Sequence, residues 1–315
     1  MTIATSARPT AWFEHPALFY RDQRDYLAAM MRFVSNGIDA GEPVMVAVPT
    51  NNLNLLRSGL GSDADDIEMH DMTVAGRNPG RIIGDVLLGF AAKHAGRRVR
   101  IVGEPIWAGR DATEYPACAQ HEALINAAFE GIDATILCPY NTSELDPEVI
   151  ADAKRTHPTL WTDRDRWTSD AYDDAIATAE SFNLPLAPEP TSAVTLSIYP
   201  SNPNETRRFT ASFALAVGLS VDRVADAVLV VDELVSNTIV HGGGYGRLAA
   251  WTDDKRIVFE VSDAGYIKDP LAGRRPVRLD QVGGRGLMLV HRLSDLVRIH
   301  TTPEGTAIRS YIAVD

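Results

Sequence analysis

Cysteine, long hydrophobic runs and basic clusters are scarce in this chain of 315 residues. Its two cysteines, Cys118 and Cys138, are too few for a disulfide scaffold and lack the CxxC spacing typical of zinc sites, so we expect reduced thiols. No run approaches the ~18 consecutive apolar residues of a membrane span. The first ten residues lack the basic start and apolar centre of a signal peptide. We therefore expect a cytoplasmic protein without a membrane partner.

Acidic residues outnumber basic ones, and the formal net charge is -12. A nucleic-acid backbone would be repelled by this average field, so we expect no direct nucleic-acid binding. The composition, with 45% hydrophobic and 23% charged residues, is ordinary for a globular protein. A chain of this length is most simply divided into two domains, because single cores rarely grow much larger.

The first half alternates amphipathic helical windows with short apolar runs, a pattern that predicts βαβ units and an α/β fold with a mostly parallel sheet. The sequence contains no internal repeat and, in this half, no GxxxxGK[ST] loop for a Walker-type ATP site. We expect helices at 26–38, 81–95, 113–129 and 147–156, and strands at 43–48, 99–102 and 134–138.

Three prolines within residues 184–190 predict an extended linker. We therefore expect an N-terminal domain at 1–183 and a C-terminal domain at 191–315. In the second half, Asn202 and Ser220 are suited to cap two helices that end near 218 and 242. Strands are expected at 194–199, 247–252, 256–263, 296–300 and 306–313, and a further helix at 287–293. This order predicts an α+β domain with a largely antiparallel sheet.

Glu233, Asn237 and His241 are spaced four residues apart and would share one face of the helix that begins after Ser220. An Asn supplies a hard oxygen ligand for Mg²⁺, and a Glu can accept the proton of a hydroxyl that attacks a γ-phosphate. Taken alone, this spacing is equally typical of a solvated helix face.

Two glycine-containing segments follow that helix. Asp263 ends an apolar strand two residues before Gly265, and such an Asp can accept the exocyclic amine of adenine. The alternative is an ordinary turn. The second segment stands directly before a helical pattern, where backbone N–H groups can bind phosphate, although a glycine-rich loop without a ligand is also common; its residues are Gly283, Gly284, Arg285 and Gly286.

In their order and spacing, these three elements resemble the N, G1 and G2 boxes of the GHKL (Bergerat-fold, histidine kinase-like) ATPases. The resemblance covers about 125 residues. It implies a domain that binds ATP and Mg²⁺. By this resemblance Asn237 chelates Mg²⁺, Glu233 acts as the base and Asp263 with Thr306 reads adenine. The nucleotide loops would be shaped by Gly265, Gly283, Gly284 and Gly286, with Arg285 available to neutralise phosphate charge.

One position departs from the pattern of the family. The first glycine box is commonly DxGxG, whereas here Ile267 stands in place of the second glycine. We expect this side chain to narrow or remodel the nucleotide pocket. His241 also has an alternative interpretation as a phosphoacceptor, although in the N box this position closes the helix.

The compact C-terminal half is similar to the anti-sigma serine kinases among GHKL proteins. No helical hairpin with a phosphoacceptor His precedes residue 191, and only a few residues follow Tyr311. The resemblance implies a kinase for a Ser/Thr of a STAS-domain anti-sigma antagonist, or an anti-sigma factor that holds a sigma factor. A switch protein with weak or no activity remains an alternative, as does an atypical histidine kinase. The sequence is also compatible with a homodimer.

The N-terminal half resembles the MEDS sensory domain, a RecA-like α/β unit, through residues 14–20, 41–44, 100–104, 122–126 and 137–140. This resemblance implies signal input, with a small molecule as a candidate ligand. His15, Cys138 and Tyr140 are candidate sensory residues. For His15 the alternative is packing near the domain edge, and for Cys138 it is a small buried residue. Trp107 and Tyr140 either line a pocket at the strand ends or belong to the core.

Overall fold

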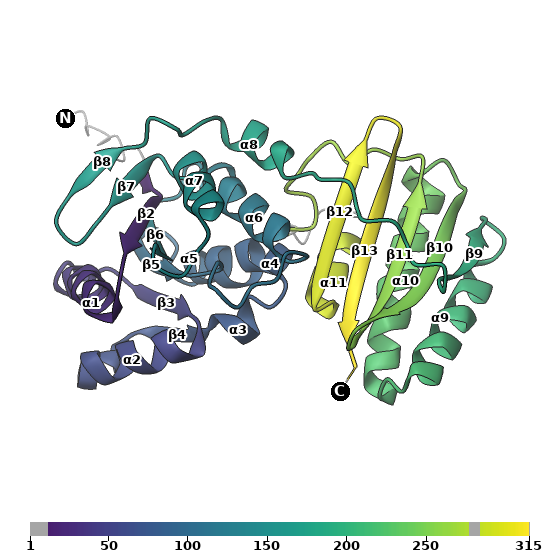
Figure 1. Ribbon diagram of the computed structural model, residues 1–315, viewed down its shortest axis with the longest axis horizontal. Coiled ribbons are helices and arrows are strands. Elements are labelled where there is room, and N and C mark those ends of the chain that lie inside the picture. Colours follow the sequence, from purple (N-terminus) through teal and green to yellow (C-terminus); the bar gives the residue numbers. More distant parts are fainter. Residues whose placement is uncertain (1–11, 277–283, 315) are drawn as a thin grey trace, which may run out of the picture.

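The computed structural model describes residues 12–276 and 284–314, and it contains two sheets that each carry their own helices (Figure 1). The N-terminal sheet contains β1 (Phe13–Glu14), β2 (Pro16–Tyr20), β3 (Val44–Val48), β4 (Glu68–Asp71), β5 (Val99–Gly103), β6 (Ala134–Asn141), β7 (Thr159–Trp161) and β8 (Arg166–Thr168). The helices around it are α1 (Gln23–Asp39), α2 (Thr50–Leu60), η1 (Gly61–Asp66), α3 (Met72–Ala75), α4 (Pro79–Arg81), η2 (Ile82–Leu88), α5 (Gly89–Lys93), α6 (Tyr115–Ala128), α7 (Pro147–Thr156) and α8 (Ala175–Ser181).

The strand order of the N-terminal sheet is β4-β3-β5-β6-β2-β7-β8, with β1 paired to β6. All of these pairs are parallel except β7 with β8, so the predicted mostly parallel α/β fold is confirmed. Every residue of β3 is buried, as expected for a parallel strand covered on both faces. Met45 and Ala47 pack against the helices on one face of the sheet. Val44, Val46 and Val48 pack against α1 and α2 on the other face.

The single helix expected at 81–95 is instead a composite of α4, η2 and α5. The seven residues of η2 form a π-helix, in which hydrogen bonds reach one residue further than in an α-helix. The apolar periodicity of this region predicted a helix but carried no signal for the change in winding.

The C-terminal half forms an α+β unit with a five-stranded sheet in the order β12-β13-β11-β10-β9. All described pairs in it are antiparallel, which confirms the predicted class. Its strands are β9 (Val194–Ile198), β10 (Gly246–Asp253), β11 (Arg256–Asp263), β12 (Leu296–Thr302) and β13 (Gly305–Ala313). Its helices are α9 (Pro203–Val217), α10 (Val221–His241) and α11 (Gly286–Leu293). They cover one face of the sheet and share its apolar core.

Two expectations for the C-terminal half need correction. Apolar and polar residues alternate over 194–199, which predicts a strand with one buried face, but β9 lies at the sheet edge, where only Ile198 is buried and Val194 is 49% exposed. Asn202 and Ser220 do precede α9 and α10, but neither side chain accepts a hydrogen bond from the first turn of its helix. Asn202 instead accepts from the backbone of Tyr199 and donates to Glu205.

The other face of the C-terminal sheet meets the N-terminal half. Ala117 of α6 belongs to an apolar cluster with Trp251, Leu296 and Tyr311 of the sheet. Buried Asn78 donates to the backbone oxygen of His291 at 2.7 Å. The two halves therefore share a packed interface. Further polar contacts cross it, namely Arg292 with Asp85, Arg298 with the backbone oxygen of Thr113, and Asn183 with Thr301.

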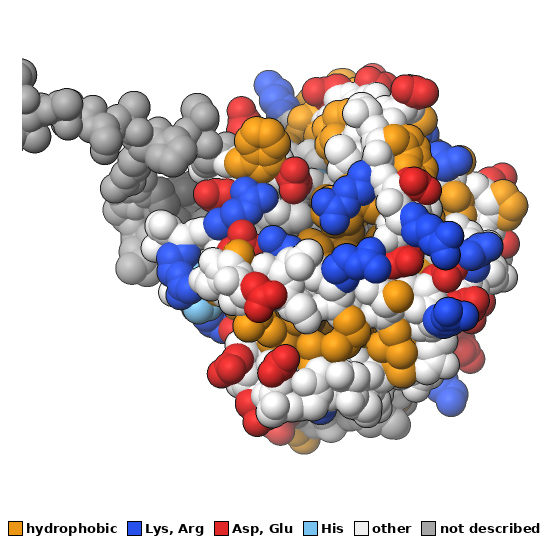
Figure 2. Space-filling model, turned by 90° about the vertical axis from the view of Figure 1, so that its left-hand side faces the viewer, with side chains coloured by type: hydrophobic (Ala, Val, Ile, Leu, Met, Phe, Trp, Pro, Cys, Tyr) orange, Lys and Arg blue, Asp and Glu red, His pale blue; other side chains and the backbone are white. Residues whose placement is uncertain are grey.

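The face of the N-terminal half that is turned away from the C-terminal half carries both positively and negatively charged side chains. Figure 2 shows Lys and Arg interleaved with Asp and Glu, with hydrophobic side chains exposed between them. Among the described residues, the helices are all too short or too polar to cross a bilayer.

Candidate functional site

A cavity of about 650 Å³ lies in the C-terminal half beside α10. Residues of α10, β11, β13 and the start of α11 form one part of its wall. The rest comes from residues 264–276, which leave β11 and which we call the connecting segment. The lining residues include most of the predicted nucleotide site, namely Asn237, Asp263, Gly265, Gly284, Gly286 and Thr306.

Glu233 and Asn237 converge on the first residue of α11. A Cβ atom added to Gly286 would lie 2.6 Å from Glu233 Oε2 and 3.7 Å from Asn237 Nδ2. Both side chains come from adjacent turns of one face of α10, as their spacing predicted. A carboxylate, an amide and the backbone at a helix N-terminus thus meet in one small volume. This combination suits a metal-bound phosphate and a hydroxyl that must lose a proton.

Asp263 is fixed in position by two donors. Its Oδ1 accepts from the backbone N–H of Gly265 at 2.8 Å, and its Oδ2 accepts from the Thr238 hydroxyl at 2.7 Å. A carboxylate offers about four acceptor positions, so capacity for an amine donor remains. The geometry agrees with the role that the resemblance gives to this residue.

Thr306 lies directly opposite Asp263 across the β11–β13 ladder. Its hydroxyl donates to the backbone oxygen of Gly265 at 2.8 Å and lies 2.6 Å from the hydroxyl of Thr301. Thr306 therefore holds the turn after Asp263 as well as lining the cavity. The structure brings the two residues of the predicted adenine site together.

Glycines let the backbone approach Asp263 closely. A Cβ atom on Gly242 would lie 2.4 Å from the Asp263 Cγ, and one on Gly265 would lie 2.9 Å from Oδ1. Gly305 has a φ of +156°, and a Cβ atom there would meet the Asp263 backbone oxygen at 2.6 Å. Side chains at these three positions would displace the carboxylate or the turn.

Ile267 lines the cavity, and its backbone N–H donates to the Thr301 hydroxyl at 3.0 Å. Asp254 alone has a positive φ among the described residues that are not glycine, so Ile267 has an ordinary backbone conformation. The backbone at this position does not require glycine. The Ile side chain also packs against the apolar core of the C-terminal half.

The remaining predicted residues lie around the mouth of the cavity. His241 and Gly284 line it, and Arg285 immediately precedes α11. Gly283 lies outside the described residues. The acceptor role considered for His241 stays a prediction.

The connecting segment is anchored on the N-terminal half. Arg274 donates to Gln120 Oε1 at 2.6 Å, and Arg275 donates to the backbone oxygen of Ala127 at 2.8 Å. Both acceptors belong to α6. Leu271 is 3% exposed and packs in the N-terminal core. Half of the residues that line the C-terminal cavity are therefore held by contacts with the other half of the chain.

A second cavity, of about 370 Å³, opens at the carboxyl ends of the parallel strands in the N-terminal half. Open α/β sheets usually bind ligands at this edge. Of the two alternatives left open for these residues, Trp107 lines this cavity, whereas Tyr140 is 1% exposed and belongs to the core. Buried Glu104 accepts from Asn52, Tyr20 and Tyr26. Burial raises the pKa of Glu104 to about 8.

His15 and Cys138 meet in a buried group with Glu122 and His157. The expectation that His15 packs near the domain edge is wrong, because the side chain is 1% exposed and lies between α6, β6 and the end of α7. Cys138 is buried and not in a disulfide, as predicted. Both residues are contact partners of Glu122 and do not line the second cavity.

Several residues of these sites were not found in the sequence. Thr238, which follows Asn237 on a different face of α10, donates its hydroxyl to Asp263. Thr301 accepts from the backbone N–H of Ile267 and is hydrogen-bonded to the hydroxyl of Thr306. A Thr beside the N box was the available signal for the first. Glu104 follows Gly103 within the segment 100–104 that resembles the MEDS domain, but nothing in the sequence singled out its side chain, and no spacing marked His157.

Comparison with known proteins assigns each half separately. Residues 14–158 match the family model MEDS (methanogen/methylotroph, DcmR sensory domain), and residues 199–312 match the family model of the histidine kinase-like ATPase domain. Two curated anti-sigma F factors are similar to this chain, one from Thermoanaerobacter sp. (strain X514) and one from Thermoanaerobacter pseudethanolicus. Each is 29% identical over an alignment of 141 residues that covers 40% of this chain and 99% of the relative.

Among solved structures, a chain with the RsbU and RsbW domains of a Mycobacterium tuberculosis protein matches at a TM-score of 0.31 and 19% identity. That match covers 40% of this chain and 33% of the other, so this chain spans about a third of that structure.

Proposed function

We propose that this protein, in which a MEDS domain precedes a histidine kinase-like ATPase domain, is a partner-switching anti-sigma regulator that binds Mg²⁺-ATP and phosphorylates its antagonist. The observation that carries the proposal is the convergence of Glu233 and Asn237 on Gly286, at the wall of a cavity that Asp263 also lines. Base, metal ligand and adenine acceptor are thereby arranged along one pocket.

The chemistry follows from these positions. Asn237 would hold Mg²⁺, whose charge offsets that of the phosphates when the nucleotide is bound. Its amide oxygen is a hard donor of the kind this ion prefers, and the ion usually keeps waters and phosphate oxygens as its other ligands. Glu233 would accept the proton of the attacking hydroxyl, and the backbone at the start of α11, next to Gly286, would offer N–H groups to the phosphates.

The acceptor that we propose is a Ser/Thr of a STAS-domain antagonist, and the bound target is a sigma factor. Similarity to two anti-sigma F factors supports this choice of partners. In such a switch, transfer of the phosphate would decide which partner the regulator holds.

We further propose that the N-terminal domain at 1–183 supplies the signal through the linker at 184–190 and through the connecting segment. Support comes from the anchoring of Arg274 and Arg275 on α6. A small molecule in the second cavity, beside Trp107 and Glu104, would act on the edge of the same sheet that α6 covers.

A second candidate function is a protein-binding switch with weak or absent ATP turnover. Ile267, in place of the second glycine of the first glycine box, favours it. This candidate predicts binding of the partners without transfer of phosphate.

The test begins with Mg²⁺-ATP binding by calorimetry for the wild type and Asn237→Ala. We expect the affinity of Asn237→Ala to fall about 10- to 100-fold with Mg²⁺ present, because hydrogen bonds and ligands to charged groups contribute about 1.5–3 kcal/mol. Without Mg²⁺ the two proteins should differ little. A wild type that binds no ATP at millimolar concentration would leave only the second candidate.

Transfer of radiolabelled phosphate to STAS proteins then identifies the acceptor. A label stable to acid and labile to base indicates Ser or Thr, whereas an acid-labile label would support the histidine kinase alternative. No transfer to any STAS protein, with ATP bound, would contradict the kinase assignment and favour the binding switch.

A further inference from the structure

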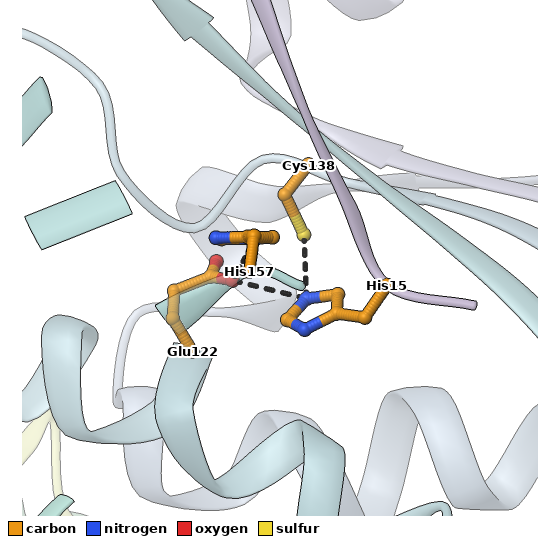
Figure 3. A group of neighbouring side chains, drawn as sticks. All are labelled: His15, Glu122, Cys138 and His157. Carbon is orange, nitrogen blue, oxygen red and sulfur yellow. Dashed lines mark hydrogen bonds and ion pairs between the residues drawn. The ribbon is translucent and has the colours of Figure 1, made fainter. Parts of the chain in front are cut away.

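Four side chains with metal-binding atoms meet in the interior of the N-terminal half. They are His15, between β1 and β2, Glu122 on α6, Cys138 on β6 and His157, directly after α7. Figure 3 shows them pointing toward one another from these four elements. Each is at most 1% exposed, and their ligand atoms all lie within 4.8 Å of one another.

The tautomers of both histidines follow from their hydrogen bonds. His157 Nδ1 lies 2.8 Å from the backbone oxygen of Ala153, which can only accept. His15 Nδ1 lies 3.1 Å from Asn126 Oδ1, and the Asn126 amide is oriented by its own donation to two backbone oxygens. Both Nδ1 atoms therefore donate, so in the neutral rings each Nε2 directs a lone pair into the group.

Those lone pairs face a carboxylate. Glu122 Oε2 lies 3.3 Å from His15 Nε2 and 3.1 Å from His157 Nε2, yet neither contact has hydrogen-bond geometry. Both oxygens of Glu122 and the Nε2 of His157 are buried without a hydrogen-bond partner among the described residues. Burying unpartnered acceptors against one another is costly, and a cation among them removes that cost.

The closest separations between the ligand atoms match those of a tetrahedral metal centre. At zinc distances of about 2.0–2.1 Å for N and O and about 2.3 Å for S, tetrahedral ligands lie about 3.3 Å apart for N to O and about 3.6 Å apart for N to S. The contacts with Glu122 are 3.3 and 3.1 Å, and His15 Nε2 lies 3.4 Å from Cys138 Sγ. The other separations are at most 4.8 Å, so metal binding would draw the widest of them together by up to about 1.2–1.5 Å.

We propose that His15, Glu122, Cys138 and His157 bind one divalent transition-metal ion, with Zn²⁺ the best match. Two neutral imidazoles, one carboxylate and one thiolate balance its charge, and the donors of both imidazoles to Ala153 and Asn126 are the outer contacts that metal-bound histidines usually make. The thiol loses its proton when the metal binds. Four elements distant in the sequence would be joined at one point.

The test uses the full-length protein, purified under reducing conditions and analysed for metal content. Because the site is buried, metal should remain bound during purification at one ion per chain. The protein is then refolded with Co²⁺, whose absorption spectrum reports both tetrahedral geometry and a thiolate ligand. We expect the tetrahedral bands together with a thiolate-to-cobalt charge-transfer band.

Cys138→Ser should lose the charge-transfer band and bind Co²⁺ more than about 100-fold more weakly, since loss of outer contacts alone costs about 10- to 100-fold. Cys118→Ser is the matched control, because Cys118 is also buried and not in a disulfide but lies outside the group. It should keep both the band and the stoichiometry.

The wild-type result decides the matter even if a variant fails to fold. A wild type that takes up neither Zn²⁺ nor Co²⁺ on refolding would overturn the proposal and leave an ordinary buried His-Glu-His contact. A cobalt spectrum without the thiolate band, or one that Cys138→Ser leaves unchanged, would also overturn it.

Discussion

The cavity beside α10 is lined by several glycines together with polar and apolar side chains, whereas the group around Glu122 consists of four buried side chains in contact. The first is about 650 Å³ in volume and open to a substrate that must enter and leave. The second consists of side chains whose polar atoms already lie close together and that are each at most 1% exposed. One chain thus contains a site suited to turnover and a site suited to permanent occupation. The difference teaches that the burial of a polar side chain, more than its residue type, indicates whether it serves in turnover or in permanent binding.

The strongest test of this contrast is Glu233→Gln in the open site. A general base contributes about 10²- to 10⁴-fold, so phosphate transfer to the STAS partner should fall by that factor. ATP affinity should change less than about threefold, because in the proposed mechanism Glu233 acts on the hydroxyl and not on the nucleotide. Transfer assays and calorimetry measure the two quantities.

Glu148→Gln provides the matched control, since Glu148 lies exposed on α7 far from the cavity in sequence and fold. It should leave transfer unchanged. Equal losses in both variants would mean that Glu233 has no special role.

The second test concerns charge in the interior of the N-terminal half. Burial raises the pKa of Glu104 from an ordinary value of 4.5 to about 8, so the folded state holds a proton that the unfolded state releases. The corresponding stability is fully present below pH 4.5 and is lost as the pH rises to about 8. The free energy of unfolding should fall over this window by a few kcal/mol.

Glu104→Gln removes the titrating group, and its unfolding free energy, measured by urea titration, should lack this part of the decline. Glu144→Gln alters an exposed carboxyl at the same cavity and should keep the wild-type slope. Parallel pH profiles for the wild type and Glu104→Gln would show that Glu104 is ionised in the folded protein.

A third test asks whether nucleotide binding in the cavity beside α10 requires the absence of a side chain at Gly286. In Gly286→Ala the new Cβ atom would lie 2.6 Å from Glu233 Oε2. Overpacking typically costs about 1–3 kcal/mol, so ATP affinity should fall roughly tenfold. Helix stability should not suffer, because Ala is the better helix former.

Gly103→Ala is the control, because its Cβ atom would meet nothing within 4 Å and no positive φ is involved. Its ATP affinity, determined by calorimetry, should equal that of the wild type. An unchanged affinity in Gly286→Ala would indicate that the nucleotide does not approach α11.

The smallest effect is expected at the interface that joins the two regions. Arg292→Ala removes three hydrogen bonds to Asp85 at 2.6–3.0 Å, and Arg292 is exposed. Exposed ion pairs contribute about 0–1 kcal/mol, so the thermal midpoint should drop by a few degrees at most, and less at high salt. Arg207→Ala breaks a similar pair with Asp232 inside the C-terminal half. Only Arg292→Ala should also alter ATP affinity, and equal ATP affinities in the two variants would argue against coupling through α11.

The sequence predicted the open site far better than the buried one, for a physical reason. Glu233, Asn237 and Asp263 lie within about thirty residues, and helix periodicity or a strand end fixes where each side chain points. The members of the buried group lie at positions 15, 122, 138 and 157, so only the sheet topology brings them together. No spacing could have revealed that.

The fold shows the same division. Strands with continuous apolar runs, such as β3 and β6, and helices with clear caps or prolines, such as α7, were predicted within a few residues. The edge strands β4 and β8 were missed, because their residues are half-buried or exposed, and β7, which pairs with β8, is only three residues long and carries little periodic signal. The π-helical turn of η2 depends on packing that the local sequence does not encode.

Helix α6 has one residue, Glu122, in the buried group and two others, Gln120 and Ala127, that hold the connecting segment at the nucleotide cavity. If the metal proposed for the buried group and the nucleotide proposed for the cavity beside α10 favour different positions of this helix, each changes the affinity of the other by the same factor, since equilibrium coupling is reciprocal. Under the proposed function, a regulator built this way would respond to its stimulus and to ATP together.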